Sequence, residues 1–273
     1  MKIVSTVKEL TAIREELKGS VGFVATMGAM HNGHLSLIRQ ARIQNDTVVV
    51  SIFVNPTQFL PNEDYEKYPR REEADLKICT LAGVDILFMP TCEEMYAKTE
   101  PEILAPKNLA YILEGSSRPG HFDGVLRIVL KLLNLVRPTN AYFGKKDAQQ
   151  LYLIQNMVKT LFINTNIIPC DIVRESDGLA LSSRNIYLGE KDRVQALALS
   201  IALKNASQAI MKGEREAKKI ELIMLESLQD LKVDYAKALS RNFEAKEQII
   251  VKETILLIAA FVGNTRLIDN LWI

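Results

Sequence analysis

Hydrophobic positions in the first two-thirds of the chain form two alternating kinds of segment. Consecutive apolar and β-branched residues, as in 47–55 (TVVVSIFVN), are typical of strands buried on both faces. Elsewhere apolar residues recur every three or four positions, as Leu35, Ile38 and Ala41 do, which predicts the buried face of a helix. Further predicted strands are 21–26, 84–89, 141–143 and 167–173, and further predicted helices are 70–82, 124–136 and 147–159. Strands that alternate with helices predict an α/β fold, a Rossmann-type doubly wound sheet of mostly parallel strands.

The pattern changes after about residue 173. Residues 189–231 are highly charged and predict long helices, and the stretches 249–251 and 256–262 are of the kind that pairs antiparallel. We therefore predict two domains. Residues 1–172 form the nucleotide-binding domain, and residues 173–273 form a small α+β domain.

Charge and composition narrow the class of function. The formal net charge is +1, and between Lys212 and Glu253 nine Lys/Arg balance nine Asp/Glu, so no basic surface predicts a nucleic-acid or membrane partner. No apolar run reaches the roughly 18 residues that span a bilayer, and the polar N-terminus is unlike a signal peptide. The three cysteines match no zinc or redox spacing, which indicates buried thiols. We expect a cytoplasmic protein.

The strongest chemical signal is the segment 26–34 (TMGAMHNGH), which lies between the first buried strand and a helix. Ligands of open α/β sheets bind outside the carboxyl ends of the strands, where helix N-termini offer N–H groups to phosphate. Gly28 and Gly33 allow a close approach of the backbone, and His31 and His34 can donate hydrogen bonds. This loop predicts an ATP triphosphate site.

Weaker signals follow along the chain. Asn55 ends the second strand, with Gln58 shortly after, and residues 118–124 (RPGHFDG) form a glycine-rich loop with one cation. Residues 143–150 (FGKKDAQQ) join a strand to a helix and suit contacts to phosphate and to ribose or a metal. Residues 181–184 (LSSR) suit a mobile phosphate loop. Taken singly, these segments also fit a strand terminator, a long connection, a solvated helix cap and a serine-rich linker.

Together the segments resemble the pantothenate synthetase (pantoate–β-alanine ligase) family. The resemblance runs through TMGAMHNGHL, VSIFVNPTQF, YPR, SRPGHFDGV, FGKKDAQQL and SDGLALSSRNIYL to the terminal TRLIDN, and so spans nearly the whole chain. It implies that ATP and pantoate form pantoyl adenylate with release of pyrophosphate, and that β-alanine then gives pantothenate and AMP. It also implies a Mg²⁺-dependent cytoplasmic homodimer with a C-terminal lid.

The resemblance assigns roles to particular residues. It implies catalytic roles for His34, Lys146 and Arg184. It implies that ATP is bound by Met27, Gly28, Ala29, Met30, His31, Asn32, Gly33, His34, Gly144, Lys145, Lys146, Asp147, Val173, Leu181, Ser182, Ser183 and Arg184. It places Gln58, Gln150, Asn55, Tyr68 and Arg118 around pantoate and β-alanine. No residue is predicted as a metal ligand. Four positions depart from the usual residues: Ala25 for proline, Thr57 and Leu181 for methionine, and Lys145 for glutamate.

Neutral amides at the acceptor site favour this reaction over its nearest alternative. Gln58 and Gln150 can donate to and accept from the pantoate hydroxyls. Another H-x-G-H nucleotidylyltransferase, acting on a phosphate ester, should place cations there instead. The balanced charge of the C-terminal region disfavours an aminoacyl-tRNA synthetase. A non-enzymatic module would bind ATP without turnover.

Overall fold

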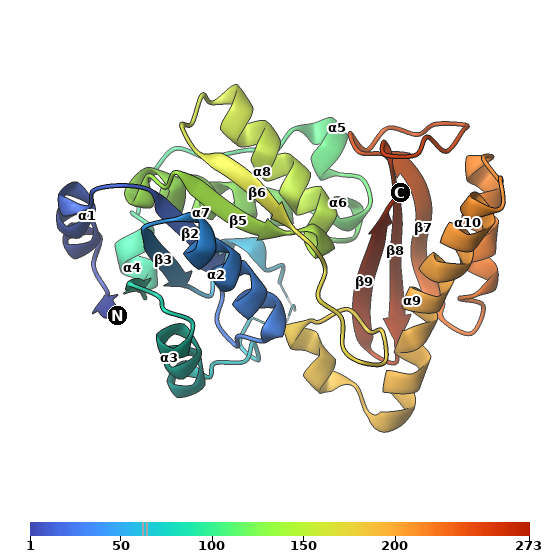
Figure 1. Ribbon diagram of the computed structural model, residues 1–273, viewed down its shortest axis with the longest axis horizontal. Coiled ribbons are helices and arrows are strands. Elements are labelled where there is room, and N and C mark those ends of the chain that lie inside the picture. The colour runs from blue at the N-terminus through green and yellow to red at the C-terminus, as the bar shows by residue number, and fades with distance from the viewer. Residues whose placement is uncertain (62, 64) are drawn as a thin grey trace. The chain divides into compact units, whose positions relative to one another are not determined.

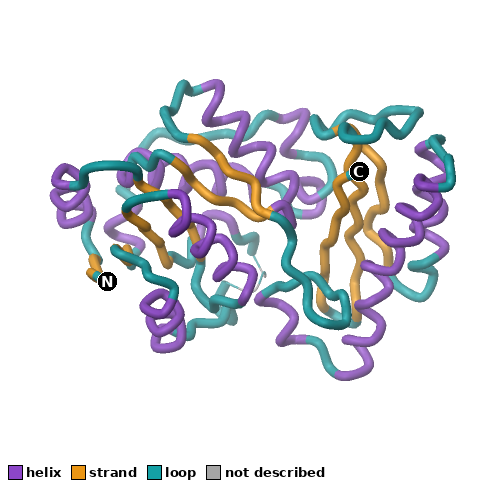
Figure 2. Tube along the Cα trace, viewed as in Figure 1, coloured by secondary structure: helices purple, strands orange, loops and turns teal. Residues whose placement is uncertain are grey.

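The computed structural model describes residues 1–61, 63 and 65–273. Its larger sheet has six strands in the order β1-β4-β3-β2-β5-β6, and every pair is parallel (Figures 1 and 2). The strands are β1 (Lys2–Val4), β2 (Val21–Thr26), β3 (Thr47–Ile52), β4 (Ile86–Phe88), β5 (Asn140–Gly144) and β6 (Asn166–Cys170). The predicted α/β fold class is confirmed. Of these strands, only the three-residue β1 was not predicted.

Helices connect the strands and cover both faces of this sheet. Val24 packs with Ile38 of α2 and Cys79 of α3 on one face, while Phe23 is buried on the other, where α7 contacts β2. The helices are α1 (Val7–Glu16), α2 (Asn32–Gln44), α3 (Glu72–Leu81), α4 (Cys92–Met95), α5 (Lys107–Ala110), α6 (Glu114–Ser117), α7 (His121–Val136) and α8 (Ala148–Thr160), with the 3₁₀ turns η1 (Pro56–Gln58) and η2 (Lys145–Asp147). The apolar helix predicted at 124–136 is thus α7, which starts three residues earlier.

The strand order places the predicted motifs at one edge of the sheet. From β2 the chain winds outward through β3 to β4, and later it continues on the opposite side of β2 with β5 and β6. The order therefore reverses between β2 and β5, the position at which doubly wound sheets bind ligands. Gln58 ends the turn η1 that follows β3, residues 27–34 form the loop after β2 and the start of α2, and Gly144 is the last residue of β5.

The chain divides into two compact units, residues 1–145 with 149–171 and residues 146–148 with 172–273. The second unit contains η3 (Ser183–Tyr187), α9 (Glu190–Met211) and α10 (Ala217–Glu226). Its antiparallel sheet has the order β7-β8-β9, formed by β7 (Lys232–Ser240), β8 (Thr254–Val262) and β9 (Thr265–Trp272). Leu199, Ile220, Leu256 and Ile258 are among its buried core residues.

The long helices predicted within 189–231 are α9 and α10, separated by a turn in which Gly213 has a φ of 104°. Three other details of the C-terminal prediction were wrong. Residues 249–251 are not a strand, and Ile249 instead buries its side chain beside the sheet. Strand β7 was missed because the irregular register between Val233 and Tyr235 interrupts the apolar alternation that a strand should show. Strand β9 was missed because the polar Asp269 and Asn270 occupy buried positions in it.

Among the described residues, no helix has both the length and the apolar character needed to cross a bilayer. Cys79 and Cys170 are buried, as predicted, and burial raises their pKa to about 12 and about 11. Cys92 is only half-buried, which the sequence did not indicate.

Candidate active site

The loop after β2 turns sharply before α2 begins. Gly28 and Ala29 both have positive φ angles, 83° and 49°. A Cβ on Gly28 would lie only 3.0 Å from a carboxylate oxygen of Asp75 and 3.1 Å from Ile52, so glycine suits both the conformation and the space. The Thr26 hydroxyl donates to the Ser51 carbonyl (2.8 Å) and accepts from the Gly28 N–H (3.2 Å), which ties the loop to β3.

A buried carboxylate from α3 holds the middle of this loop. Asp75, 2% exposed, accepts hydrogen bonds from the backbone N–H groups of Ala29 (2.8 Å) and Met30 (2.7 Å). Charge-assisted bonds of this kind are among the stronger ones in proteins. Sequence reasoning missed Asp75, because an acidic residue in the first turn of a charged helix is also typical of a solvated cap.

The two loop histidines are fixed by the start of α2. His31 is the N-cap residue, and its Nδ1 accepts from the Gly33 N–H (3.1 Å), while Nδ1 of His34 accepts from the His31 N–H (3.3 Å). The ring centroids are 4.2 Å apart. Because Nδ1 is an acceptor in both rings, the proton of each neutral imidazole is on Nε2. Both side chains therefore have an Nε2–H donor.

Gln58 connects the end of β3 with the loop after β2. Its Nε2 donates to the sulfur of Met27 (3.2 Å), and its Oε1 accepts from Nδ2 of Asn55 (3.0 Å). Asn55, 1% exposed, also donates to the Gly124 carbonyl (3.1 Å). This network fixes the orientation of the Gln58 amide, with its NH₂ group toward Met27 in the loop that follows β2.

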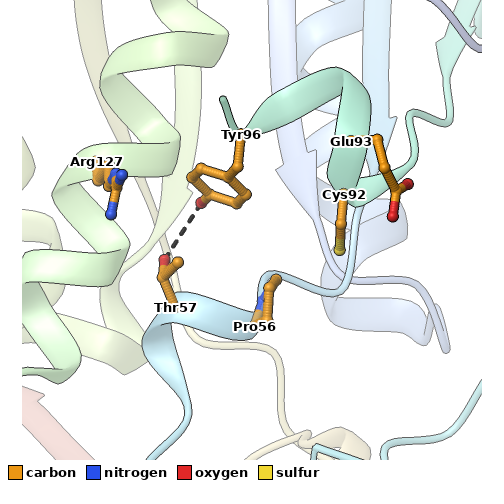
Figure 3. A pocket seen from close by; sticks show the side chains of 6 residues that line it. All are labelled: Pro56, Thr57, Cys92, Glu93, Tyr96 and Arg127. Carbon is orange, nitrogen blue, oxygen red and sulfur yellow. Dashed lines mark hydrogen bonds between the residues drawn. The ribbon is translucent and has the colours of Figure 1, made fainter. Parts of the chain in front are cut away.

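Tyr96 and Thr57 hold Asn55 from the other side. Both hydroxyls donate to Oδ1 of Asn55, at 2.5 Å for Tyr96 and 2.9 Å for Thr57, so Asn55 presents its NH₂ to Gln58. The same two side chains line an open pocket of about 350 Å³ (Figure 3). Its other lining residues are Pro56, Cys92, Glu93 and Arg127. Tyr96 thus lies between this pocket and the Asn55 side chain.

Arg118 does not present an unpaired charge, because it forms two hydrogen bonds to Glu63 (2.6 and 2.7 Å). Burial raises the pKa of Glu63, but the bonds to Arg118 and its charge outweigh burial and lower that pKa below its ordinary value. Arg118 also donates to the Gln58 carbonyl (3.3 Å). It therefore contacts Gln58 through the backbone.

His121 is a second side chain that contacts the Gln58 carbonyl. Its Nδ1 lies 2.8 Å from the Gln58 carbonyl and its Nε2 lies 3.1 Å from the Arg118 guanidinium. Since a carbonyl only accepts and a guanidinium only donates, His121 is neutral with its proton on Nδ1. Burial and, next, the Arg118 charge lower the pKa of His121 to about 4. Apart from the presence of a histidine in the 118–124 loop, no sequence signal indicated this role.

Lys145, Tyr68 and Gln150 are further predicted site residues in the first unit. Lys145 forms an ion pair with Asp171 (2.5 Å), which compensates the charge that departs from the family pattern. Tyr68 is buried with its ring 5.9 Å from that of Phe59. Gln150 is half-buried in the first turn of α8, and no hydrogen bond among the described residues links it to Gln58. Within the described part of the chain, a side-chain hydrogen bond therefore joins Gln58, but not Gln150, to the loop that follows β2.

The second unit carries the other predicted ATP contacts. Lys146 and Asp147 end η2, and Val173 begins a hairpin that closes where the Leu181 N–H donates to the Val173 carbonyl (3.0 Å). Ser182 caps η3 by accepting from the Arg184 N–H (3.2 Å). Residues 182–184 are thus a capped turn, and their mobility stays a prediction.

Comparisons with known proteins agree along the whole chain. The family model for pantoate-beta-alanine ligase matches residues 2–272. The chain is 56% identical to the pantothenate synthetases of Campylobacter fetus and of Aliarcobacter butzleri, with 100% of each chain covered in both comparisons.

Solved structures agree with this match. The crystal structure of pantothenate synthetase from Thermus thermophilus superposes with a TM-score of 0.94 at 40% identity, covering 99% of both chains. The pantoate-beta-alanine ligase of Francisella tularensis, complexed with beta-gamma ATP and β-alanine, superposes with a TM-score of 0.81 at 38% identity, covering 100% of this chain and 97% of the other. This chain therefore belongs to the pantoate–β-alanine ligase family.

Proposed function

We propose that this chain condenses pantoate with β-alanine in two steps, at the edge of the sheet where the carboxyl ends of β2, β3 and β5 lie. A pantoate carboxylate oxygen attacks the α-phosphorus of ATP, and pyrophosphate leaves. The β-alanine amine then attacks the carbonyl carbon of the pantoyl adenylate, an amide bond forms, and AMP leaves with the former carboxylate oxygen. The observation that carries this proposal is the bond between Gln58 and Met27, which places a neutral amide beside the histidine-capped loop.

Catalysis of the first step requires charge neutralisation, because an anionic carboxylate approaches an anionic phosphate. We assign this role to His34, through its Nε2–H, and to Lys146 and Arg184, together with the N-terminus of α2. Preorganised donors of this sort are usually the largest catalytic contribution. Pyrophosphate is a good leaving group, so His34 stabilises the transition state by hydrogen bonding rather than by full proton transfer.

The ATP contacts belong to four parts of the chain. Residues 27–34 approach the triphosphate, with their backbone conformation fixed by Asp75. Residues 144–147 and 181–184 contribute further contacts, and the Val173 backbone reads the adenine base. Residues 173–273 act as a lid that shields the adenylate from water.

Pantoate is recognised by neutral groups. Gln58 and Gln150 bond its hydroxyls, and a site built in this way strongly rejects analogues that lack them. Asn55 and Arg118 act through Gln58, one on its side chain and the other on its carbonyl. Tyr68 contributes part of the apolar wall.

Mg²⁺ enters this proposal as the counter-ion of the triphosphate. Within residues 1–61, 63 and 65–273, no three His, Cys, Asp or Glu side chains gather into a metal site. Mg²⁺ commonly keeps several waters and takes one or two carboxylates plus substrate phosphates. Asp147 is the one acidic side chain among the residues assigned to ATP, so it is the carboxylate that would hold the ion, and the bound ion would neutralise phosphate charge.

The resemblance also supports a cytoplasmic homodimer. Light scattering at micromolar concentration tests the dimer, with a mass near 61 kDa expected against 30.7 kDa for one chain.

The two-step reaction is tested by following pyrophosphate and AMP separately. ATP with pantoate alone should release pyrophosphate, and AMP should follow when β-alanine is added. Transfer of AMP to a phosphate ester without any need for pantoate would instead support the H-x-G-H nucleotidylyltransferase alternative. ATP binding without pyrophosphate release would support a non-enzymatic module.

A further inference from the structure

The last strand of the second unit carries two adjacent buried polar residues. Asp269 is 3% exposed and Asn270 is 2% exposed, although their partners on β8, Ile258 and Leu257, are apolar. Burying a carboxylate and an amide is unfavourable unless hydrogen-bond partners compensate it. Their partners therefore show what the two side chains hold.

Asp269 holds the hairpin that starts at Val173. Its two oxygens accept from the guanidinium of Arg174, at 2.7 and 2.9 Å, in the paired geometry that fixes an arginine most firmly. The same guanidinium donates to the Gly178 carbonyl (3.1 Å) at the turn of the hairpin. One carboxylate thus fixes the segment that carries Val173 and the turn before Leu181.

Asn270 holds a different segment. Its Nδ2 donates to the backbone carbonyl of Lys146 (2.8 Å). Lys146 lies far from β9 in sequence, and this bond fixes the main chain from which its side chain extends. Because Asp269 and Asn270 are neighbours on one hydrogen-bonded strand, both segments are held by the same rigid element.

We propose that Asp269 and Asn270 are positioning residues for ATP, with Asp269 placing the adenine-reading hairpin and Asn270 placing the phosphate-binding Lys146. This inference rests on the proposed function of Val173 and Lys146. Asp269 and Asn270 should affect different half-reactions. Adenine is present in ATP and in pantoyl adenylate, whereas the pyrophosphate group is present only in ATP. Loss of Asp269 should therefore impair both half-reactions, and loss of Asn270 only the first.

The experiment compares Asp269→Asn and Asn270→Asp in the full-length protein. Pyrophosphate release is measured with ATP and pantoate, and pantothenate formation is measured from supplied pantoyl adenylate and β-alanine. Matched controls in the same unit are Asp234→Asn, which breaks a similar pair with Arg266 (2.6 Å), and Asn205→Asp, which removes a similar bond to Ser227 (3.1 Å). Thermal unfolding is recorded for each variant.

Asn270→Asp should slow pyrophosphate release about tenfold or more and leave the second half-reaction within about twofold of wild type. Asp269→Asn should slow both by similar factors, and the controls should slow neither. If Asp269→Asn does not fold, Arg174→Lys tests the same contact at a side chain that is 30% exposed. Asn270→Gln, which keeps the amide donor, should recover part of the lost rate.

Equal losses in both half-reactions for Asn270→Asp, or wild-type rates in both folded variants, would overturn the inference. A wild-type protein that releases no pyrophosphate with pantoate would instead overturn the proposed function. The two failures are therefore distinguishable.

Discussion

Replacing Gly124 with alanine tests whether the position of Gln58 controls the use of pantoate. Gly124 lies in the first turn of α7, directly against η1. A Cβ added there would lie 2.2 Å from the Thr57 carbonyl oxygen, 2.4 Å from its carbon and 2.6 Å from the Gln58 nitrogen. These are backbone atoms, so no side-chain rotation relieves the clash.

The size of the displacement follows from these distances. An ordinary carbon–oxygen contact is no closer than about 3.4 Å, so η1 and α7 must separate by about 1.2 Å. α7 is buried along most of its length, whereas Thr57 is exposed, so η1 is the part that moves. A shift of about 1 Å at a substrate-positioning residue costs about 10²-fold in rate. The overpacking itself should lower the free energy of unfolding by about 1–3 kcal/mol.

Pyrophosphate release at saturating ATP, measured over a range of pantoate concentrations, reports the effect on the use of pantoate. Urea unfolding reports the effect on stability. We expect Gly124→Ala to lower kcat/KM for pantoate about 100-fold, while urea unfolding shows a folded protein. Gly189→Ala is the matched control, because Gly189 has a φ of −69° and an added Cβ would meet no atom within 4 Å. A folded Gly124→Ala variant with kcat/KM for pantoate within threefold of wild type would refute the role of Gln58.

Four further perturbations test other parts of the site. His34→Ala removes a transition-state donor and should lower kcat by about 10²–10³, with unchanged urea unfolding; more than about a third of wild-type turnover would contradict this. Gln150→Ala should lower kcat/KM for pantoate at least about tenfold and leave the ATP Kd, measured by calorimetry, unchanged; a matching loss of ATP affinity would contradict the assignment. Arg184→Ala should slow pyrophosphate release and raise the ratio of AMP to pantothenate formed, because the open site lets water reach the adenylate; an unchanged ratio counts against a clamp. For His121, the folded-state pKa of about 4 lies below the ordinary 6.5, so the unfolded state binds more protons between these values and stability falls as pH drops from about 6.5 to 4, by at most about 3 kcal/mol. Urea unfolding at several pH values should show that His121→Asn lacks this part of the pH dependence, and equal slopes would contradict the neutral buried state.

Local patterns predicted the elements that bury a continuous apolar run. The run 21–26 is strand β2 residue for residue, and the apolar segment 124–136 lies inside α7. β1 has only three residues, too few to establish a period, and β7 contains an irregular register. β9 was also missed, because the polar Asp269 and Asn270 stand at buried positions in it. The prediction therefore failed where an element was too short, too irregular or too polar for its side-chain spacing to be informative.

The candidate site likewise contains residues that the sequence predicted and residues that only the fold reveals. The carboxyl-end rule brought Asn55, Gln58 and residues 27–34 to one edge of the sheet from sequence alone. Asp75 could not be found, because its partners, the N–H groups of Ala29 and Met30, are distant in sequence and carry no side-chain signature. Likewise, the Asp171 partner of Lys145 becomes visible only when β5 and β6 are paired. Residues that support the site thus become visible only in the fold, whereas those predicted to contact substrate lie in recognisable local motifs.

The central claim, that pantoate is activated through its carboxylate as an adenylate, is tested most directly by oxygen labelling. Pantoate with ¹⁸O in its carboxylate is incubated with ATP, Mg²⁺, β-alanine and the enzyme, and AMP is analysed by mass spectrometry. Attack of the carboxylate on the α-phosphorus leaves the bridging oxygen on AMP, so one ¹⁸O atom should appear in each AMP formed. AMP without label, or label in phosphate or pyrophosphate, would contradict the account.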